Sequence, residues 1–225
     1  MKYQFDWVVL WRYREALLNG LLLTIGISMV ALLGAVMVGI LIGTASTSRQ
    51  WWLRGISYTY VEICRNIPLL VHILFWYVGL SALRIPNFWC AVLGLSVYSS
   101  AYIAEIVRSG IQSVPIGQTE AAIASGLKMS QALLHVVYPQ ALRIVVPSMA
   151  GMFSQIIKDS SLASVIAVTE LTFQAGAIEG ETFRSFEAYI GVSGFYLIFV
   201  WLITQSLQLV FRGKVIDQNK FLWGA

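Results

Sequence analysis

The sequence predicts an all-α integral membrane protein with five transmembrane helices, an N-terminal interfacial helix and a short cytoplasmic helix. Of its 225 residues, 58% are hydrophobic and only 12% are charged, against about 25% charged in soluble domains. The mean hydropathy is +0.74, and long windows without any charge recur along the chain. A water-soluble enzyme is therefore excluded, and a single membrane domain over residues 1–225 is expected.

Uncharged windows locate the five spans. Residues 16–48 carry no charge, and residues 21–43 within them are enough to cross a hydrocarbon core of about 30 Å. The other spans are expected at residues 56–83, 85–108, 144–168 and 188–211. Residues 5–18 mix aromatic, aliphatic and charged side chains, which is typical of a helix lying in the outer membrane interface.

Two local features refine the first and second spans. Gly39 and Gly43 lie four residues apart in the first span, a spacing that lets another helix approach closely. In the second span, Asn66 is followed by Pro68, which should break the helix because proline lacks a backbone N–H. The carbonyl groups freed at such a break can line a cavity in a membrane protein.

Basic residues in the connections predict the orientation. Eight Lys and Arg residues fall on the side that contains the C-terminus and five on the side that contains the N-terminus. Because connections rich in Lys and Arg stay in the cytoplasm, we expect the C-terminus inside and the N-terminus outside. The segment at residues 169–187 carries four Glu and one Arg, and is expected to be an outside loop.

Catalytic and metal-binding patterns are missing from the sequence. Its one Gly-Lys pair, Gly213-Lys214, is followed by Val, so there is no phosphate-binding loop of the GxxxxGK[ST] type. Cys64, Cys90 and the two isolated histidines have no metal-ligand spacing, and the scattered basic residues form no nucleic-acid patch. We therefore expect no enzyme activity, no metal and no cofactor in this chain.

The connection at residues 113–139 carries the most informative pattern. Pro115 and Gly117 interrupt the preceding helix, small residues follow, and Gly126 permits a sharp exit. These features predict a short helix that can dock against another protein, although an ordinary interfacial connector has a similar composition. The order is Glu120-Ala121-Ala122, three residues, Gly126, nine residues, then Val136-Val-Tyr138-Pro139.

This order resembles the EAA loop of ABC-importer permeases, Glu-Ala-Ala, three residues, Gly, nine residues, Ile-x-Leu-Pro. Val136 and Tyr138 replace the Ile and the Leu of that pattern. The resemblance implies the type I importer permease fold. It also implies that the short helix is a coupling helix, docked on a separate ATPase that hydrolyses ATP. The coupling residues it implies are Glu120, Ala121, Ala122, Gly126 and Pro139.

Further stretches resemble the polar-amino-acid permeases, the group for histidine, glutamine, arginine, glutamate and aspartate. They include Tyr60-Val-Glu62-Ile-Cys-Arg65-Asn66-Ile-Pro68, Ala101-Tyr102-Ile-Ala-Glu105-Ile-Val-Arg108 and Lys158-Asp159-Ser160-Ser161-Leu162. The stretches that look most like the glutamate/aspartate branch are Arg65-Asn66-Ile67-Pro68, Gln174-Ala175-Gly176, Ser185-Phe186 and the ending around Arg212-Gly-Lys-Val. Lys158-Asp159-Ser160 departs from that branch, where Lys-Asn-Ser is expected.

Charged residues inside the spans are candidates for the substrate path. A charge near the middle of a span costs about 2.5–3.5 kcal/mol on insertion scales, so it usually faces a partner or an aqueous path. Lys158 and Asp159 lie about 21 Å along the fourth span at helical rise. Asp159 could receive an α-ammonium group, and Ser160 or Ser161 the backbone end of an amino acid. Alternatively, Lys158 and Asp159 pair only with neighbouring helices.

The second and third spans supply further candidates for this path. Asn66 and Pro68 mark the helix break, while Tyr102 and Glu105 lie at helical spacing on the third span. A structural ion pair of Glu105 with Arg108, three residues away, is the favoured alternative for that carboxylate.

The sequence thus predicts the permease subunit of an ATP-driven importer in the bacterial cytoplasmic (inner) membrane, with glutamate or aspartate favoured as substrate. Arginine, histidine or glutamine are the alternative substrates. Its expected partners are an ATP-binding cassette ATPase dimer, a second permease subunit, identical or paralogous, and an extracytoplasmic amino-acid-binding protein. A stand-alone secondary transporter would transport without an ATPase and usually shows internal repeats, which are not found here. A mere membrane anchor would leave Lys158 and Asp159 without a purpose.

Overall fold

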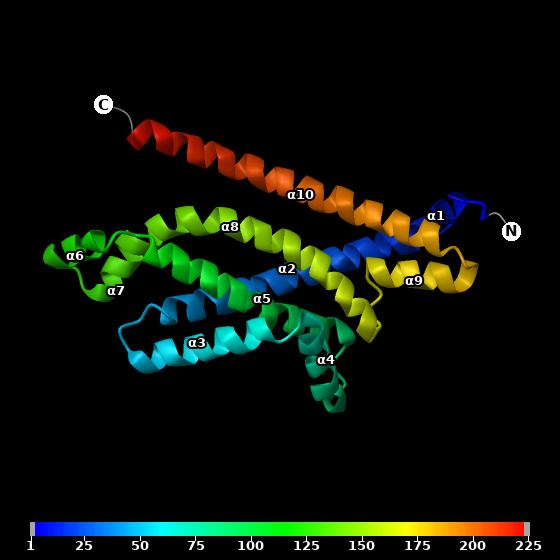
Figure 1. The fold of residues 1–225 in the computed structure, drawn as a ribbon, viewed down its shortest axis with the longest axis horizontal. Helices are drawn as coiled ribbons and strands as arrows, with labels where there is room; N and C mark the ends of the chain where they lie inside the picture. The colour runs from blue at the N-terminus through cyan, green and yellow to red at the C-terminus, as the bar shows by residue number, and fades with distance from the viewer. Residues whose placement is uncertain (1–2, 223–225) are drawn as a thin grey trace. The chain divides into compact units, whose positions relative to one another are not determined.

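The computed structural model describes residues 3–222, with side chains described up to residue 207, and this part of the chain is helical without strands. Figure 1 shows the elements in order. The α-helices are α1 (Val8–Arg12), α2 (Arg14–Ala45), α3 (Trp51–Asn66), α4 (Leu69–Gly79), α5 (Asn87–Gln112), α6 (Ile116–Ala124), α7 (Met129–Ala132), α8 (Tyr138–Asp159), α9 (Leu171–Thr182) and α10 (Ser185–Leu222). Shorter helical turns are η1 (Ser81–Leu83), the π-helix η2 (Leu133–Val137) and the 3-10 helix η3 (Ser160–Ile166).

Four segments of the described chain are long and apolar enough to cross a membrane unbroken. They are Arg14–Ala45, Asn87–Gln112, Met129–Ile166 and Ser185–Leu207. A fifth candidate is the pair α3 and α4, which passes the same test together but bends by 101°. The all-α membrane architecture predicted from the sequence is confirmed, with five spans when the bent pair counts as one.

The break in the second span lies where the sequence predicted it. Helix α3 ends at Asn66, Ile67 has an extended backbone with φ −93° and ψ 129°, and α4 begins directly after Pro68. The ring of a proline disfavours helical geometry in the preceding residue, which explains the extended Ile67. The bend therefore follows from local sequence alone.

Several expected boundaries were wrong. Residues 5–18 do not form one interfacial helix, because α1 has only five residues and α2 already starts at Arg14. The fourth spanning segment starts at Met129 rather than near residue 144, and the loop expected at residues 169–187 contains α9. Windows without charge mark the apolar centre of a span but miss helical turns that carry polar or charged side chains.

Contacts divide the chain into two compact units. Within the described residues, the first contains residues 3–32, 69–95 and 153–222, and the second contains residues 33–68 and 96–152.

In the second unit, glycines of α2 lie against α5. A Cβ atom at Gly39 would lie 2.6 Å from Ile103 Cγ2, and one at Gly43 would lie 2.6 Å from the Ala104 carbonyl oxygen. The close helix approach predicted from the Gly39–Gly43 spacing is thus confirmed, because only glycine leaves room for the facing backbone. Tyr60 of α3 joins the same group through a hydrogen bond of 2.6 Å with Ser100.

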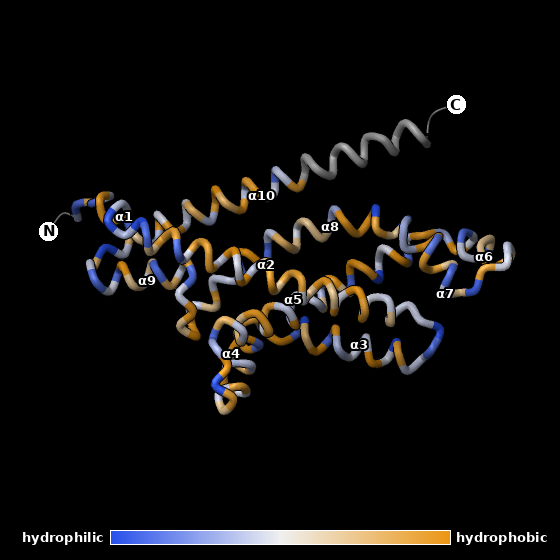
Figure 2. The backbone as a smooth tube through the Cα atoms, turned by 180° about the vertical axis from the view of Figure 1, so that it is seen from behind, coloured by the Kyte–Doolittle hydropathy of each residue, from blue (hydrophilic) through white to orange (hydrophobic). Residues whose placement is uncertain are grey.

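In the first unit, α1, the start of α2, α9 and α10 share an apolar core. Its buried members are Val9, Leu17, Leu171, Ala175, Ile178, Ala188 and Val192. Figure 1 shows α9 beside the first turns of α10, as their contacts require. Apolar colouring follows much of α2, whereas hydrophilic residues mark α6 and α7 (Figure 2).

Both cysteines are buried side chains within helices. Cys64 lies in α3 and Cys90 in α5, with 4% and 1% of their surface exposed. Neither forms a disulfide.

We expect Gly43→Ala to destabilise the protein, because the added methyl group would collide with backbone at Ala104. Overpacking of this kind costs about 1–3 kcal/mol, which thermal unfolding in detergent would register as a lower Tm. Gly26→Ala in the same helix is the matched control, since a Cβ atom there meets nothing within 4 Å. Equal melting temperatures for the two variants would contradict the proposed packing.

Candidate functional site

The coupling segment in residues 113–139 has the short helix expected from its sequence. Helix α6 follows Pro115, and Gly126 takes φ +90°, in the region that favours glycine. The N–H of Leu127 donates to the Ala122 carbonyl at 3.1 Å, which closes the end of the helix. The glycine is therefore needed by the backbone itself.

Side chains of α6 divide into an inner and an outer face. Ala122 is buried, whereas Glu120 and Ala121 are exposed. Ile116 and Ile123 are also exposed, by 75% and 41%, on a helix outside the spanning segments. These two isoleucines are not among the predicted coupling residues, although two large apolar residues among small ones are a usable signal for a docking face.

Pro139 does not end the coupling segment as a loop residue. It is the second residue of α8, which follows directly on the π-helix η2, so its missing N–H falls where π-helical hydrogen bonding changes to α-helical. Its neighbour Tyr138 donates a hydrogen bond of 2.7 Å to Thr44 Oγ1 of α2. The return of the chain into its fourth span is thereby fixed within the second unit.

A charged pocket of about 320 Å³ lies in the second unit. Arg108 donates from Nη2 and Nε to the two Glu105 oxygens, at 2.8 Å and 3.1 Å. Arg65 approaches Glu105 to 4.0 Å and lies over the Tyr102 ring at 5.2 Å. The ion pair of Glu105 with Arg108 expected from the sequence is present, so this carboxylate has two cationic neighbours.

Asn66 lies next to this pocket, and its side-chain amide is already hydrogen-bonded to Glu62. Its Nδ2 donates to the Glu62 carbonyl at 2.7 Å and to Glu62 Oε2 at 3.0 Å. Glu62 lines the pocket together with Arg54. Three guanidinium groups, from Arg54, Arg65 and Arg108, therefore face two carboxylates, and the pocket has a surplus of positive charge.

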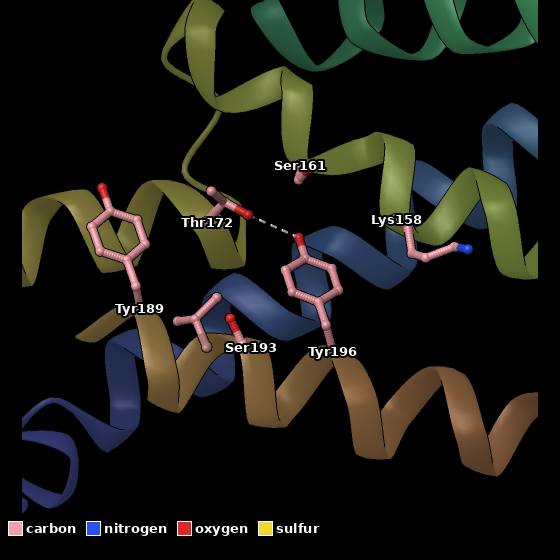
Figure 3. Close-up of a pocket in the computed structure, with 7 residues that line it drawn as sticks. Lys158, Ser161, Thr172, Tyr189, Ser193 and Tyr196 are labelled. Carbon is pink, nitrogen blue, oxygen red and sulfur yellow. Dashed lines mark hydrogen bonds between the residues drawn. The ribbon is translucent and has the colours of Figure 1, made fainter. Parts of the chain in front are cut away.

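A second pocket, of about 300 Å³, belongs to the first unit (Figure 3). It is lined by Lys158, Ser161, Thr172, Tyr189, Val192, Ser193 and Tyr196. These side chains come from α8, η3, α9 and α10. Six of these seven side chains carry a nitrogen or oxygen atom, while most of the pocket surface is apolar, a combination typical of small-molecule sites.

Only two of the four neighbouring residues predicted as a substrate site line this pocket. Lys158 and Ser161 line the pocket, but Asp159 accepts from Gln155 at 2.8 Å and is not part of the lining. Ser160 is buried, and its hydroxyl donates to the Ile157 carbonyl at 2.8 Å. Within the described residues, no ion pair joins Lys158 to Asp159.

Glu170, a buried carboxylate not predicted from the sequence, holds two of the elements that line this pocket. Glu170 caps α9 by accepting from the N–H groups of Thr172 and Phe173, at 2.9 Å and 2.8 Å. The Tyr196 hydroxyl also donates to it, at 2.8 Å. Burial raises the pKa of Glu170. An acid placed just before an apolar helix was the available sequence signal.

Metal binding finds no support among the described residues, which contain no cluster of three His, Cys, Asp or Glu side chains.

Comparison with known proteins decides the family. Residues 35–216 match the family model described as "Binding-protein-dependent transport system inner membrane component". The chain belongs to this family. The resemblance to importer permeases is thereby confirmed, and the chain is the membrane component of such a transport system rather than a catalytic subunit.

Individual members of this transport family are similar over most of the chain. The probable glutamine ABC transporter permease of Bacillus subtilis (strain 168) is 39% identical over 80% of this chain and 85% of its own length. The glutamine transport system permease of Escherichia coli (strain K12) is 36% identical over 93% of this chain and 95% of its own length. The glutamate/aspartate import permease of the same strain is 30% identical over 85% of this chain and 87% of its own length.

Two solved structures share the fold of this chain. The crystal structure of an amino acid ABC transporter with histidines matches with a TM-score of 0.86 and 33% identity, over 93% of this chain and 99% of that chain. The inward-facing MetNI methionine ABC transporter matches with a TM-score of 0.79, over 90% of this chain and 97% of that chain. Its sequence identity of 20% supports the fold alone. The expected type I importer permease fold is therefore confirmed.

We expect Glu170→Ala to lower the Tm of the purified protein in detergent. The change removes a helix cap and leaves buried donors unpaired, a loss of about 1–3 kcal/mol. Glu181→Ala is the control, because Glu181 is an exposed acceptor of Tyr13.

The same pair of variants tests the raised pKa of Glu170. Between the ordinary Glu pKa of about 4.3 and its raised value, the folded chain binds more protons than the unfolded chain, so this group's contribution to stability falls as pH rises. Glu170→Ala should lose that part of the pH dependence of Tm. A pH profile identical to that of the wild type would contradict it.

Proposed function

We propose that this chain forms, with a second permease subunit, identical or paralogous, the path by which a polar amino acid enters a bacterium across its cytoplasmic membrane. The observation that carries this is the family match over residues 35–216, together with amino-acid permeases among the relatives. An extracytoplasmic binding protein delivers the substrate, and a separate ATP-binding cassette dimer hydrolyses ATP. The N-terminus lies outside and the C-terminus in the cytoplasm, as the distribution of basic residues favours.

A neutral polar amino acid such as glutamine is the proposed substrate. Two relatives named for glutamine are 39% and 36% identical to the chain, against 30% for one named for glutamate and aspartate. Asp159, inside the fourth span, also disfavours passage of a second negative charge. The resemblance of residues 65–68 to the glutamate/aspartate branch keeps acidic amino acids as the second candidate.

Substrate contacts are proposed within each of the two units. In the first unit, Asp159 receives the α-ammonium group and Ser161 the backbone end, while Ser160 is left to its own helix turn. In the second unit, Tyr102 and Glu105 line the path with the backbone freed at Asn66 and Pro68. The cationic neighbours of Glu105 restrict this carboxylate to a gating or orienting role.

The outer face of α6 is the proposed contact with the ATPase. Glu120 and Ala121 lie on that face, Ala122 packs beneath it, and Gly126 closes the helix. Ile116 and Ile123 add the apolar surface that a docked helix buries. A stand-alone secondary transporter would need neither this face nor an ATPase, and transport that persists without ATP would support that alternative.

Gly126→Leu should uncouple ATP hydrolysis from uptake, because a side chain at φ +90° strains the turn that ends α6 by about 1–2 kcal/mol. The measurement compares amino-acid uptake and ATPase activity in proteoliposomes containing the whole complex. Gly55→Leu is the control, since Gly55 is exposed and a Cβ atom there meets nothing within 4 Å. Wild-type uptake together with wild-type ATPase association in Gly126→Leu would remove the coupling assignment.

Asp159→Asn should weaken uptake of every substrate if the carboxylate receives the α-ammonium group. The change keeps the size but loses a charge-assisted hydrogen bond worth about 1.5–3 kcal/mol. Competition among glutamine, glutamate, histidine and arginine, measured in the wild type and the variant, tests this. Selective loss of arginine would assign Asp159 to a cationic side chain instead, and an unchanged profile with unchanged rates would make it a structural residue.

A further inference from the structure

One face of α5 carries a row of polar side chains inside the second unit. Glu105, Arg108 and Gln112 are spaced three and four residues apart, so they lie on the same side of the helix. Arg108 donates from Nη2 and Nε to the two Glu105 oxygens at 2.8 Å and 3.1 Å, and from Nη1 to Gln112 Oε1 at 3.0 Å. These three side chains are joined without a gap and form the α5 row.

Arg65 connects the α5 row to the broken second span. It is the last residue but one of α3, two residues before the extended Ile67. Its guanidinium lies 5.2 Å from the centre of the Tyr102 ring and 4.0 Å from Glu105 Oε2, the oxygen that also accepts from Arg108 Nη2. Both contacts are with α5, so the orientation of α3 at the break depends on the α5 row.

Gln112 brings the other end of the α5 row to the coupling segment. It is the last residue of α5, and only residues 113–115 separate it from α6. A connection of three residues is too short to absorb a displacement of α6. Docking of another protein at α6 therefore bears directly on the last turn of α5, where Gln112 holds Arg108.

The contacts along the row differ in strength. Arg108 satisfies both Glu105 oxygens at hydrogen-bond distance, and such bidentate pairs are the strong ones. Arg65 stays 4.0 Å from the carboxylate, beyond a hydrogen bond, and 40% of its side chain is exposed. Arg65 can therefore leave Glu105 without stranding an unpaired carboxylate in the span, so the break can change its angle while the α5 row persists.

We propose that Arg108 and Gln112 are positioning residues that couple the break at Ile67 to the ATPase contact on α6. They act through Glu105, whose orientation decides whether Arg65 is held against α5. The inference rests on the proposed function, in which α6 contacts the ATPase and the break lines the substrate path. It requires neither positioning residue to touch the substrate.

The test measures how many amino-acid molecules are imported for each ATP hydrolysed. It uses proteoliposomes with the complete complex and the external binding protein, and the probe is whichever of glutamine, glutamate, histidine and arginine the wild type imports fastest. Gln112→Leu removes the acceptor of Arg108, and Arg65→Met removes the contact at the other end. Each should lower the ratio about threefold or more, because hydrolysis continues without uptake. A merely structural role would lower uptake and hydrolysis together and leave the ratio unchanged.

The double variant tests whether the two ends communicate. Arg65→Met combined with Gln112→Leu should lose no more than either single variant, because either change already breaks the connection. Arg54→Gln is the matched control and should keep the wild-type ratio. It removes a guanidinium of α3 that lines the same pocket but, among the described side chains, has no hydrogen bond or ion pair with the α5 row. Should Gln112→Leu fail to assemble, Arg108→Lys serves instead, since it keeps the charge but cannot make both contacts.

The outcomes separate this inference from the proposed function. If the wild type imports an amino acid but Gln112→Leu keeps its ratio, or if the losses of the two single variants multiply in the double variant, the coupling role is overturned and the permease function stands. An equal loss in Arg54→Gln also overturns the role, because the net charge of the pocket then explains the effect. A wild-type complex that imports none of the four amino acids overturns both.

Discussion

Every polar group placed in hydrocarbon has to find its partner within the protein, because the bilayer offers no water to replace it. Thr24 and Ser28 satisfy this within α2 by donating to the carbonyls of Gly20 and Thr24, at 3.0 Å and 2.7 Å. Glu105 satisfies it with the guanidinium of Arg108. Glu170, just outside the spans, accepts hydrogen bonds from two backbone N–H groups and a tyrosine hydroxyl. The polar groups that lack such partners are then the natural places for ligands.

Much of the fold follows from local sequence. Charge-free windows found the apolar centres of the spans, Pro68 fixed the break between α3 and α4, and Gly126 marked the end of α6, since each of these effects acts over a few residues. Helix ends were less predictable. Helix α9 contains polar residues and glycines that look like a loop, and it packs against α10 and η3. The π-helix Leu133–Val137 is mostly apolar, but it lies in the connection between two expected spans.

The coupling segment could be predicted from the sequence, whereas the pocket could not, because local sequence does not show which helices pack together. The coupling segment is continuous in sequence, so its pattern could be identified directly. The polar pocket joins Lys158 to Thr172 and Tyr196, residues that lie on separate helices and meet only after packing. Ser160, predicted as a ligand from its place beside Lys158 and Asp159, is buried and donates its hydroxyl to the Ile157 carbonyl. Neighbours in sequence point in different directions around a helix, and only the fold decides which face a pocket.

The burial of both cysteines has a practical consequence for spectroscopy. Cys64 and Cys90 are enclosed within helices, and a thiol reagent modifies the accessible, ionised thiol. A cysteine introduced at an open, exposed glycine such as Gly55 or Gly117 would therefore react far faster than the native pair. Fluorescent or spin labels can thus be attached at chosen points of α3 and α6 in an otherwise natural chain, which opens its movements during turnover to direct distance measurement.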